Sequence, residues 1–252
     1  MEPVYTPVIW VARTLFAAQG LKFTITGAEN IPTTGGAVLM SNHLGYFDFA
    51  YAGLAALPSK RLVRFMAKDA VFRHRVSGPL MRGMHHIPVD RGAGAASFRA
   101  AVSALKAGEI VGVFPEATIS RSFELKGFKS GAVRMAQASG VPVLPMVVWG
   151  SQRVWTKGHP KRLGRTNVPV TLSVGEPIRV SRGDNADAVN EQIRARMTEL
   201  LHAAQEAYPA VRSDELKYLP VRLGGSAPTL EQATALDEED AARRAARRSS
   251  AG

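Results

Sequence analysis

The chain has 252 residues, of which 46% are hydrophobic, enough for one large domain or two small ones with an apolar core. It contains no cysteine, which excludes disulfides, thiolate nucleophiles, cysteine-ligated zinc and iron–sulfur clusters. Lysine and arginine number 32 and aspartate and glutamate 21, so the net charge of +11 should attract an anionic partner. Because zinc-finger spacing and an aromatic ribonucleoprotein signature are both missing, we expect no nucleic-acid partner.

The N-terminal segment, residues 1–20, contains an apolar stretch of about a dozen residues that is interrupted by Arg13. Its apolar stretch is shorter than the roughly 20 residues that a membrane-spanning helix needs. It has neither a basic start nor a small-residue cleavage site, which argues against a signal peptide. Trp10 and Arg13 suit the level of the lipid headgroups, so we expect an interfacial helix. A first helix that packs in the core is the alternative.

Strands and helices alternate along residues 21–220, which we interpret as one domain. Strands are expected at 21–31, 37–41, 61–68, 85–90, 109–114, 141–150 and 168–178. Helices are expected at 47–57, 69–83, 94–108, 129–140 and 184–207. The segment 141–150, "VPVLPMVVWG", is almost entirely apolar, as a strand covered on both faces should be. The alternation predicts an α/β fold with helices on both faces of a sheet.

The composition changes in the C-terminal tail, residues 221–252. Thr229 and Gln232 have the spacing of a capping box, which predicts a marginal helix in this tail. Two charge pairs are spaced for ion pairs on such a helix: Glu239–Arg243 and Asp240–Arg244. We expect the helix to present a solvated face. Contact of its arginines with anionic lipid is the alternative; these are Arg243, Arg244, Arg247 and Arg248.

The stretch "SNHLGYFDFA", residues 41–50, places His43 and Asp48 five positions apart after an apolar strand. On one helix the two side chains would be about 140° apart, because each residue turns the helix by about 100°. The pair must therefore span a strand-to-helix turn, with Asp48 in the first turn of the helix. There the carboxylate is close enough to accept a hydrogen bond from the imidazole.

An imidazole held by a carboxylate is a general base, because its other nitrogen can take a proton from a hydroxyl group. No G-x-S-x-G elbow or other exposed serine motif accompanies the pair, which excludes the usual serine-hydrolase arrangement. We therefore expect the hydroxyl to belong to the substrate. His85 and His86 are too closely spaced for ordinary chelation, and we expect no metal site.

Four further segments follow in order: "IPVDR" (87–91), "FPEATIS" (114–120), "FKSGAVRMA" (128–136) and "VPVLPMVV" (141–148). Together with "NHLGYFD" (42–48), they resemble the ordered motifs of the glycerolipid acyltransferases, specifically the lysophosphatidic acid (1-acylglycerol-3-phosphate) acyltransferase family. The resemblance covers residues 27–177. It implies a central mixed, largely parallel sheet flanked by helices. It also implies transfer of a fatty acyl chain from an acyl thioester to the free hydroxyl of 1-acylglycerol-3-phosphate, giving phosphatidic acid.

The resemblance assigns the site residues. It makes His43 and Asp48 catalytic and gives Arg91 to the acceptor phosphate. Substrate-binding candidates in the third motif and after it are Glu116, Thr118, Lys126 and Lys129. Glu116 could instead only hold its loop. The family's motifs have serine, glycine and arginine where this chain has Gly45, Ala117 and Ile119, and glycine where it has His85. Because Ile119 removes a cation, Lys126 and Lys129, and after them Arg121, are expected to compensate.

The resemblance also implies partners and location. The acyl donor is coenzyme A or acyl carrier protein, and no cofactor is expected. The protein should associate with the cytoplasmic face of the cell membrane as a peripheral or monotopic protein. Two alternatives stay open: the same chemistry with another acceptor (glycerol 3-phosphate, a lyso-ornithine lipid or a glycolipid), or a non-catalytic module that binds lipid or nucleic acid.

Overall fold

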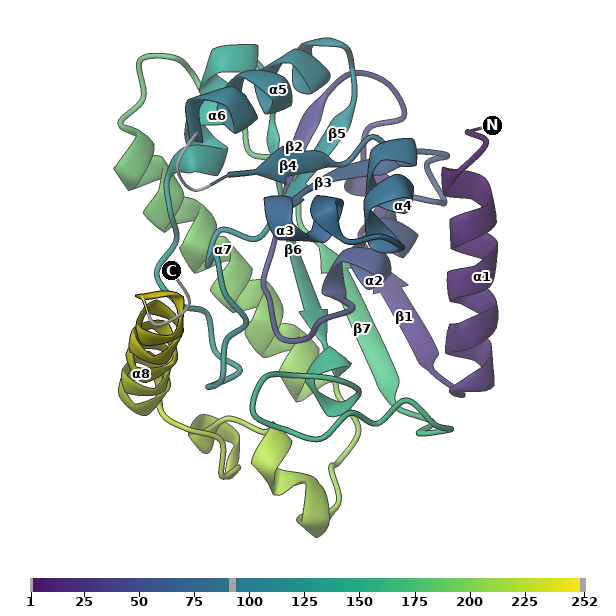
Figure 1. The fold of residues 1–252 in the computed structure, drawn as a ribbon, viewed down its shortest axis with the longest axis vertical. Coiled ribbons are helices and arrows are strands. Elements are labelled where there is room, and N and C mark those ends of the chain that lie inside the picture. Colours follow the sequence, from purple (N-terminus) through teal and green to yellow (C-terminus); the bar gives the residue numbers. More distant parts are fainter. Residues whose placement is uncertain (1, 91–93, 250–252) are drawn as a thin grey trace.

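The computed structural model describes residues 2–90 and 94–249, and its centre is one twisted sheet (Figure 1). Its strands are β1 (Lys22–Thr26), β2 (Ala37–Ser41), β3 (Val63–Lys68), β4 (Ile87–Val89), β5 (Ile110–Val113), β6 (Val143–Trp149) and β7 (Pro169–Val174). They lie in the order β1-β7-β6-β2-β5-β3-β4. All neighbours are parallel except β6 and β7, which are antiparallel. The expected α/β fold with a mixed, largely parallel sheet is confirmed.

Helices cover both faces of the sheet. One face carries α5 (Gly94–Lys106), α6 (Gly131–Ser139) and α7 (Ala186–Glu206). The opposite face carries α1 (Tyr5–Ala18) and α2 (Asp48–Ala55), and α3 (Asp69–Arg73) and α4 (Ser77–Gly83) connect β3 to β4. Short 3₁₀ helices lie at Ala28–Asn30, Ser151–Arg153, Ser213–Tyr218 and Val221–Leu223. The last helix is α8 (Leu230–Ser249).

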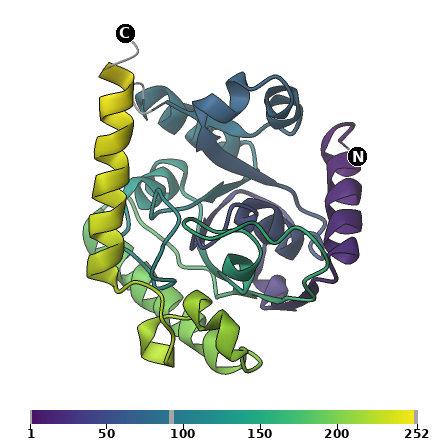
Figure 2. The same cartoon turned by 60° about the horizontal axis from the view of Figure 1, so that its bottom comes forward.

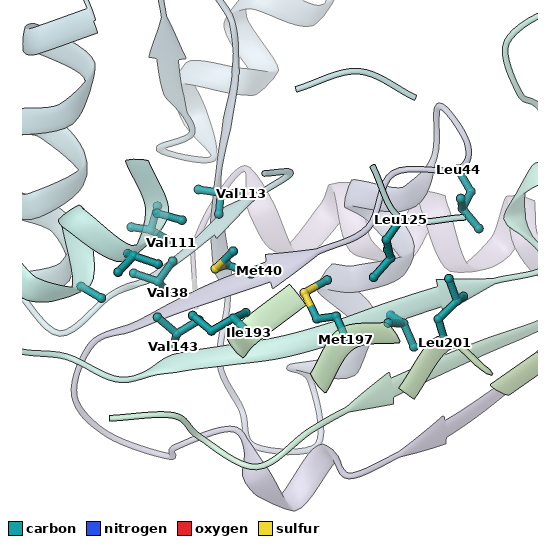
Figure 3. Packing of buried hydrophobic residues seen from close by; sticks show 14 of the residues in the cluster. Val38, Met40, Leu44, Val111, Val113, Leu125, Val143, Ile193, Met197 and Leu201 are labelled. Carbon is teal, nitrogen blue, oxygen red and sulfur yellow. The ribbon is translucent and has the colours of Figure 1, made fainter. Parts of the chain in front are cut away.

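The central strand β2 is buried over its whole length, as its apolar sequence predicts. Its side chains alternate between the two faces of the sheet. Val38 and Met40 join the core beneath α7, where they lie near Ile193 and Met197 (Figure 3). Leu39 belongs to the core on the opposite face. The segment after β2 therefore begins from a fixed point in the middle of the molecule.

Two predicted elements differ from the structure. The helix expected over 69–83 is broken after Arg73, where His74 takes an extended conformation with ψ 139°. At Gly78 a Cβ atom would lie 2.2 Å from the Phe72 carbonyl oxygen, so glycine allows the two short helices to pack closely. The strand expected over 21–31 ends at Thr26, because Gly27 adopts φ +69° and turns the chain.

Helix α1 packs on the core with one side, as the alternative for the N-terminal segment expected, and leaves apolar side chains exposed on its outer side. Tyr5 and Phe16 are buried, and the Tyr5 hydroxyl donates to the Val63 carbonyl oxygen at 2.8 Å. The outer side of the same helix exposes Trp10, Val11 and Leu15. No helix in the described part of the chain has the length and apolar character to cross a membrane.

Candidate active site

The segment after β2 is fixed to the neighbouring strand by a buried asparagine. The Asn42 side chain donates to the Val148 carbonyl oxygen at 3.0 Å and accepts from the Val148 amide at 2.7 Å. The side chain thus imitates one more residue of strand pairing between β2 and β6. This position holds His43 at the carboxyl end of a parallel strand, where α/β proteins commonly bind ligands.

The next turn brings His43 and Asp48 together as the sequence predicts. Asp48 begins α2, and His43 Nδ1 lies 3.1 Å from Asp48 Oδ2. The same oxygen accepts from the backbone amides of Leu44 at 2.6 Å and Gly45 at 2.7 Å. Asp48 is fully buried, and its position at the helix N-terminus also favours the negative charge. The carboxylate is therefore fixed before any substrate binds.

The imidazole of His43 is held on its flat side as well. It stacks on the Phe114 ring with the centroids 4.3 Å apart and the planes 24° from parallel. Its side chain is 22% exposed. Within the described residues, Nε2 forms no hydrogen bond, so it is available to a ligand. Since Nδ1 faces the carboxylate, the arrangement favours the tautomer with the proton on Nδ1 and a basic Nε2.

Glu116 connects two loops of the site. One carboxylate oxygen accepts from the His43 amide at 2.9 Å and the other accepts from the Lys126 amide at 3.1 Å. Burial raises the pKa of Glu116 to about 7, although both backbone hydrogen bonds act to lower it. Since both oxygens are used by backbone amides, this geometry favours the alternative in which Glu116 holds its loop.

The rest of this loop accommodates the residues that depart from the family's motif. Ala117 adopts φ +60°, a conformation in which glycine carries no Cβ penalty. Ile119 is buried, and the following amide, that of Ser120, donates to the His43 carbonyl oxygen at 2.7 Å. The loop is therefore bonded to both the amide and the carbonyl of His43.

A basic cluster lies on the loops bonded to His43. We define the basic cluster as Arg121, Lys126 and Lys157. Lys126 Nζ donates to Thr118 Oγ1 at 2.8 Å, so Thr118 also belongs to this region. Lys157 follows Thr156, whose hydroxyl donates to the Leu44 carbonyl oxygen at 2.5 Å. Nothing in the motif order points to Lys157, because the fold alone brings residues 121–126 and 157 together.

The acidic side of α8 packs on the basic cluster. Asp237 pairs with Lys126 at 2.5 Å and also with Lys157 and Arg121. Asp240 pairs with Arg121 at 2.5 Å and with Lys157 at 3.2 Å. The predicted solvated face is therefore wrong at these two positions.

Other predictions for the C-terminal helix are confirmed. Thr229 and Gln232 exchange the two hydrogen bonds of a capping box, at 2.9 and 3.2 Å. Glu239 and Arg243 form an ion pair at 3.9 Å. The Arg244 side chain lies outside the described part of the structure, so its pair with Asp240 stays a prediction. Among described residues, Asp240 pairs with the basic cluster and with Arg243. The boundary that we placed at residue 220 stays a prediction.

The structure describes only one of the two remaining predicted substrate-binding residues outside the basic cluster. Lys129 is exposed, and its ammonium group forms no ion pair or hydrogen bond with described residues; its backbone amide donates to the Pro115 carbonyl oxygen at 3.1 Å. Arg91 lies outside the described residues, two positions after β4 ends at Val89.

Gly45, where the family's motif has serine, lies in a tight contact. A Cβ atom there would be 3.0 Å from the Trp155 carbonyl oxygen and 3.1 Å from the Ser151 carbonyl oxygen. The Tyr46 amide donates to the same Trp155 oxygen at 3.0 Å. A serine at this position would require the 151–155 segment to move by a few tenths of an ångström. The glycine therefore fits the close approach of this segment to the turn that holds His43 and Asp48.

The adjacent histidines have different surroundings. His86 is buried, and its Nδ1 accepts from the Phe65 amide at 3.0 Å, whereas His85 is exposed at φ +57°. Across residues 2–90 and 94–249, no three acidic or histidine side chains are grouped as metal ligands.

The family model described as Acyltransferase matches residues 22–149, the segment that carries His43, Asp48 and Glu116. A 1-acyl-sn-glycerol-3-phosphate acyltransferase of Bacillus subtilis is 33% identical over 199 residues, which cover 74% of this chain and 92% of that protein. The chain belongs to the acyltransferase family.

A further relative and a solved structure are also similar to this acyltransferase. The chloroplastic 1-acyl-sn-glycerol-3-phosphate acyltransferase LPAT1 of Arabidopsis thaliana is 29% identical, and the match covers 71% of this chain but only 49% of the plant protein. The crystal structure of the 1-acyl-sn-glycerophosphate (LPA) acyltransferase PlsC from Thermotoga maritima superposes with a TM-score of 0.67 at 21% identity, covering 81% of each chain. That likeness supports the fold.

Proposed function

We propose that this acyltransferase moves a fatty acyl chain from an acyl thioester to the free hydroxyl of 1-acylglycerol-3-phosphate, giving phosphatidic acid. The observation that carries the proposal is the His43–Asp48 pair, with Nδ1 held at 3.1 Å and Nε2 open to a ligand. The printed names of the relatives in Bacillus and Arabidopsis support the same acceptor.

In the proposed mechanism, His43 Nε2 takes the proton from the acceptor hydroxyl as its oxygen attacks the thioester carbonyl carbon. Asp48 stabilises the imidazolium that forms. When the tetrahedral intermediate collapses, the carbon–sulfur bond breaks and the leaving thiolate takes the proton from Nε2. The products are an ester and a free thiol, and no covalent enzyme intermediate is needed. The donor is coenzyme A or acyl carrier protein.

The basic cluster is the proposed site of the acceptor phosphate, together with Arg91. A phosphomonoester carries close to two negative charges at neutral pH, so it needs several cations. Arg121, Lys126 and Lys157 lie on loops that are bonded directly to residues 43–44. These cations supply the charge that Ile119 cannot.

Acyl transfer to a panel of lysolipids tests the acceptor. The wild type is incubated with a labelled acyl thioester and lysophosphatidate, glycerol 3-phosphate, a lyso-ornithine lipid or a lysoglycolipid. We expect transfer to lysophosphatidate at the highest kcat/KM. A higher kcat/KM with one of the other acceptors would show that this lipid is the acceptor, with the same acyl-transfer chemistry. Binding without transfer to any of them would favour a non-catalytic module.

Acceptor kinetics test the phosphate site. Charge-assisted hydrogen bonds are worth about 1.5–3 kcal/mol each, so losing Lys126 or Lys157 to alanine should raise the acceptor KM about ten- to a hundredfold. Arg91→Ala should do the same. Lys129→Ala is the comparison, because this side chain is exposed and forms no polar contact with the described residues. An unchanged KM in the Arg91, Lys126 and Lys157 variants would place the headgroup elsewhere.

We also propose peripheral association with the cytoplasmic face of the membrane. Trp10, Val11 and Leu15 are 68%, 60% and 58% exposed on one side of α1. An exposed group of large apolar side chains is typical of a surface that contacts a membrane or another protein. The net charge of +11 favours anionic lipid. Both substrate and product are lipids, so a surface that rests on the bilayer shortens their path to the site.

A further inference from the structure

The acidic side of α8 faces the basic cluster. Ala233, Asp237 and Asp240 are spaced to lie on one side of the helix. Ala233 is buried, and the two aspartate side chains are only 15% and 23% exposed. Glu238 and Glu239, between them, point into solvent. The helix thus directs two of its four consecutive acidic residues at the three cations.

The charges of this contact match those of a substrate headgroup. Asp237 and Asp240 together carry two negative charges, and a phosphomonoester carries close to two. Asp237 also accepts from Thr118 Oγ1 at 3.3 Å, so a hydroxyl donor completes its surroundings. Although burial acts against it, the hydrogen bonds from Lys126 and Lys157 lower the pKa of Asp237 to about 2. The carboxylate is therefore ionised at neutral pH, and this chain already balances two of the three positive charges of the basic cluster.

The cations are fixed to the turn of His43, whereas α8 is held mainly by its contacts with loops, the ion pairs to the basic cluster among them. Glu116 bonds the Lys126 amide to the His43 amide, and Thr156 bonds the segment of Lys157 to Leu44. Helix α8, by contrast, packs only sparsely on the other described helices and strands. It lies at the edge of the molecule, on the side away from α1 (Figure 2). Gly224, at φ +73°, precedes it in the chain.

We propose that α8 is a strap over the acceptor site: Asp237 and Asp240 occupy the cations that bind the substrate phosphate, and a phosphomonoester displaces them. This inference rests on the proposed function, because it takes the basic cluster as the phosphate site. The apparent KM for a ligand rises as the fraction of competent protein falls, so a strap closed for nine-tenths of the time raises the KM about tenfold.

The matched variants are Asp237→Asn/Asp240→Asn and, as control, Glu238→Gln/Glu239→Gln in the full chain. Both variants remove two negative charges from α8 with nearly unchanged side-chain shapes. Only the first removes the negative charges that pair with the basic cluster. We expect the first variant to lower the KM for lysophosphatidate several-fold, up to about tenfold, with little change in kcat. The control should keep the wild-type KM. An unchanged or raised KM in the aspartate variant overturns the strap.

Amide hydrogen exchange measures the opening of α8 in the absence of acyl transfer. Inorganic phosphate added to the wild type should increase amide exchange in residues 230–249 in a saturable manner, and the aspartate variant should exchange fast without phosphate. Sodium chloride at equal ionic strength is the control. An equal increase in chloride, no change, or slower exchange with phosphate would each overturn the strap.

The two measurements also separate the strap from the proposed function. If the wild type transfers acyl chains to lysophosphatidate but phosphate does not loosen α8, only the strap fails. If no lysolipid is acylated while phosphate still loosens α8, the proposed function fails and a phosphate-gated binding site remains.

Discussion

At the scale of single residues, the paired side chains of His43 and Asp48 carry the proposed chemistry. General-base catalysis contributes about 10²–10⁴-fold in rate, so His43→Ala should lower kcat by at least that factor. Asp48→Asn should also lower kcat strongly, because an amide cannot stabilise the imidazolium and can reverse the preferred tautomer. The measurement is single-turnover acyl transfer with saturating substrates.

Thermal unfolding is the control for both variants. His43 is partly exposed and stacks on one ring, so His43→Ala should keep the wild-type melting temperature within a few degrees. Substantial residual transfer by His43→Ala would contradict the mechanism.

The sequence was sufficient for His43 and Asp48 because a single turn relates them. Strand, turn and helix signals lie within ten residues, and geometry excludes a common helix face. The motif order pointed to Lys126 and Arg121, but the complete basic cluster and its contact with α8 could not be predicted in the same way. Lys126 and Asp237 are 111 positions apart, and Lys157 carries no motif at all. Only the fold shows that they meet, and only the fold shows that the Glu116 oxygens are used by backbone amides.

At the scale of elements, the 3₁₀ helix Ser213–Tyr218 anchors the loop that carries Lys157. Glu215 is 3% exposed, and its carboxylate pairs with Arg153 at 2.5 Å and with Arg162. Those two arginines flank Lys157 in the sequence. The acidic side chain therefore fixes both ends of the segment that supplies one cation of the basic cluster.

Replacing this carboxylate should destabilise the protein. Removing one partner of a buried ion pair costs about 3–5 kcal/mol, so Glu215→Gln should lower the free energy of unfolding by roughly 3 kcal/mol. The matched control is Asp214→Asn, because Asp214 is 66% exposed and pairs only at the surface. Urea unfolding measures both. Equal free energies of unfolding in the two variants would mean that the Glu215 pairs contribute no more than surface pairs.

The expected elements and the structure differ mainly where glycine allows close packing. The alternation of strands and helices, and so the order of β2, α2 and β3, follows from apolar periodicity. The break after Arg73 does not, because it depends on the contact of Gly78 with the Phe72 carbonyl oxygen. Sequence periodicity records which faces are apolar, but it does not record how closely two backbones approach.

At the scale of the whole molecule, two buried groups make stability depend on pH in opposite directions. Burial, helped by the nearby Arg64 charge, lowers the pKa of His86 from 6.5 to about 4. Burial raises the pKa of Glu116 from 4.5 to about 7. Between pH 4.5 and 6.5, His86 is protonated in the unfolded chain but neutral in the folded chain. Over the same range, Glu116 is protonated in the folded chain but ionised in the unfolded chain. Stability therefore rises with pH through His86 and falls through Glu116.

Single variants should expose each contribution. Each shift corresponds to something on the order of 3 kcal/mol. Relative to the wild type, Glu116→Gln should gain stability as the pH rises from 4.5 to 6.5, and His86→Asn should lose it. Urea unfolding at both pH values measures this, and all other groups cancel in the comparison. Parallel pH profiles for the three proteins would mean that neither pKa is shifted.

The exposed side of α1 is the proposed contact of the whole molecule with a membrane. Trp10→Ser/Val11→Ser/Leu15→Ser should weaken binding to vesicles by at least about tenfold, because each side chain loses part of the roughly 1.5–3 kcal/mol that its burial contributes. The variant keeps Tyr5 and Phe16, which attach α1 to the core, so folding should be unaffected. Leu230→Ser is the control, since Leu230 is 46% exposed but begins α8, which lies on the side of the molecule away from α1 (Figure 2). Co-sedimentation with neutral vesicles is the measurement, because anionic lipid would add attraction to the basic surface. If the triple variant binds these vesicles as well as the wild type and Leu230→Ser do, α1 is not the membrane contact and its exposed residues need another partner.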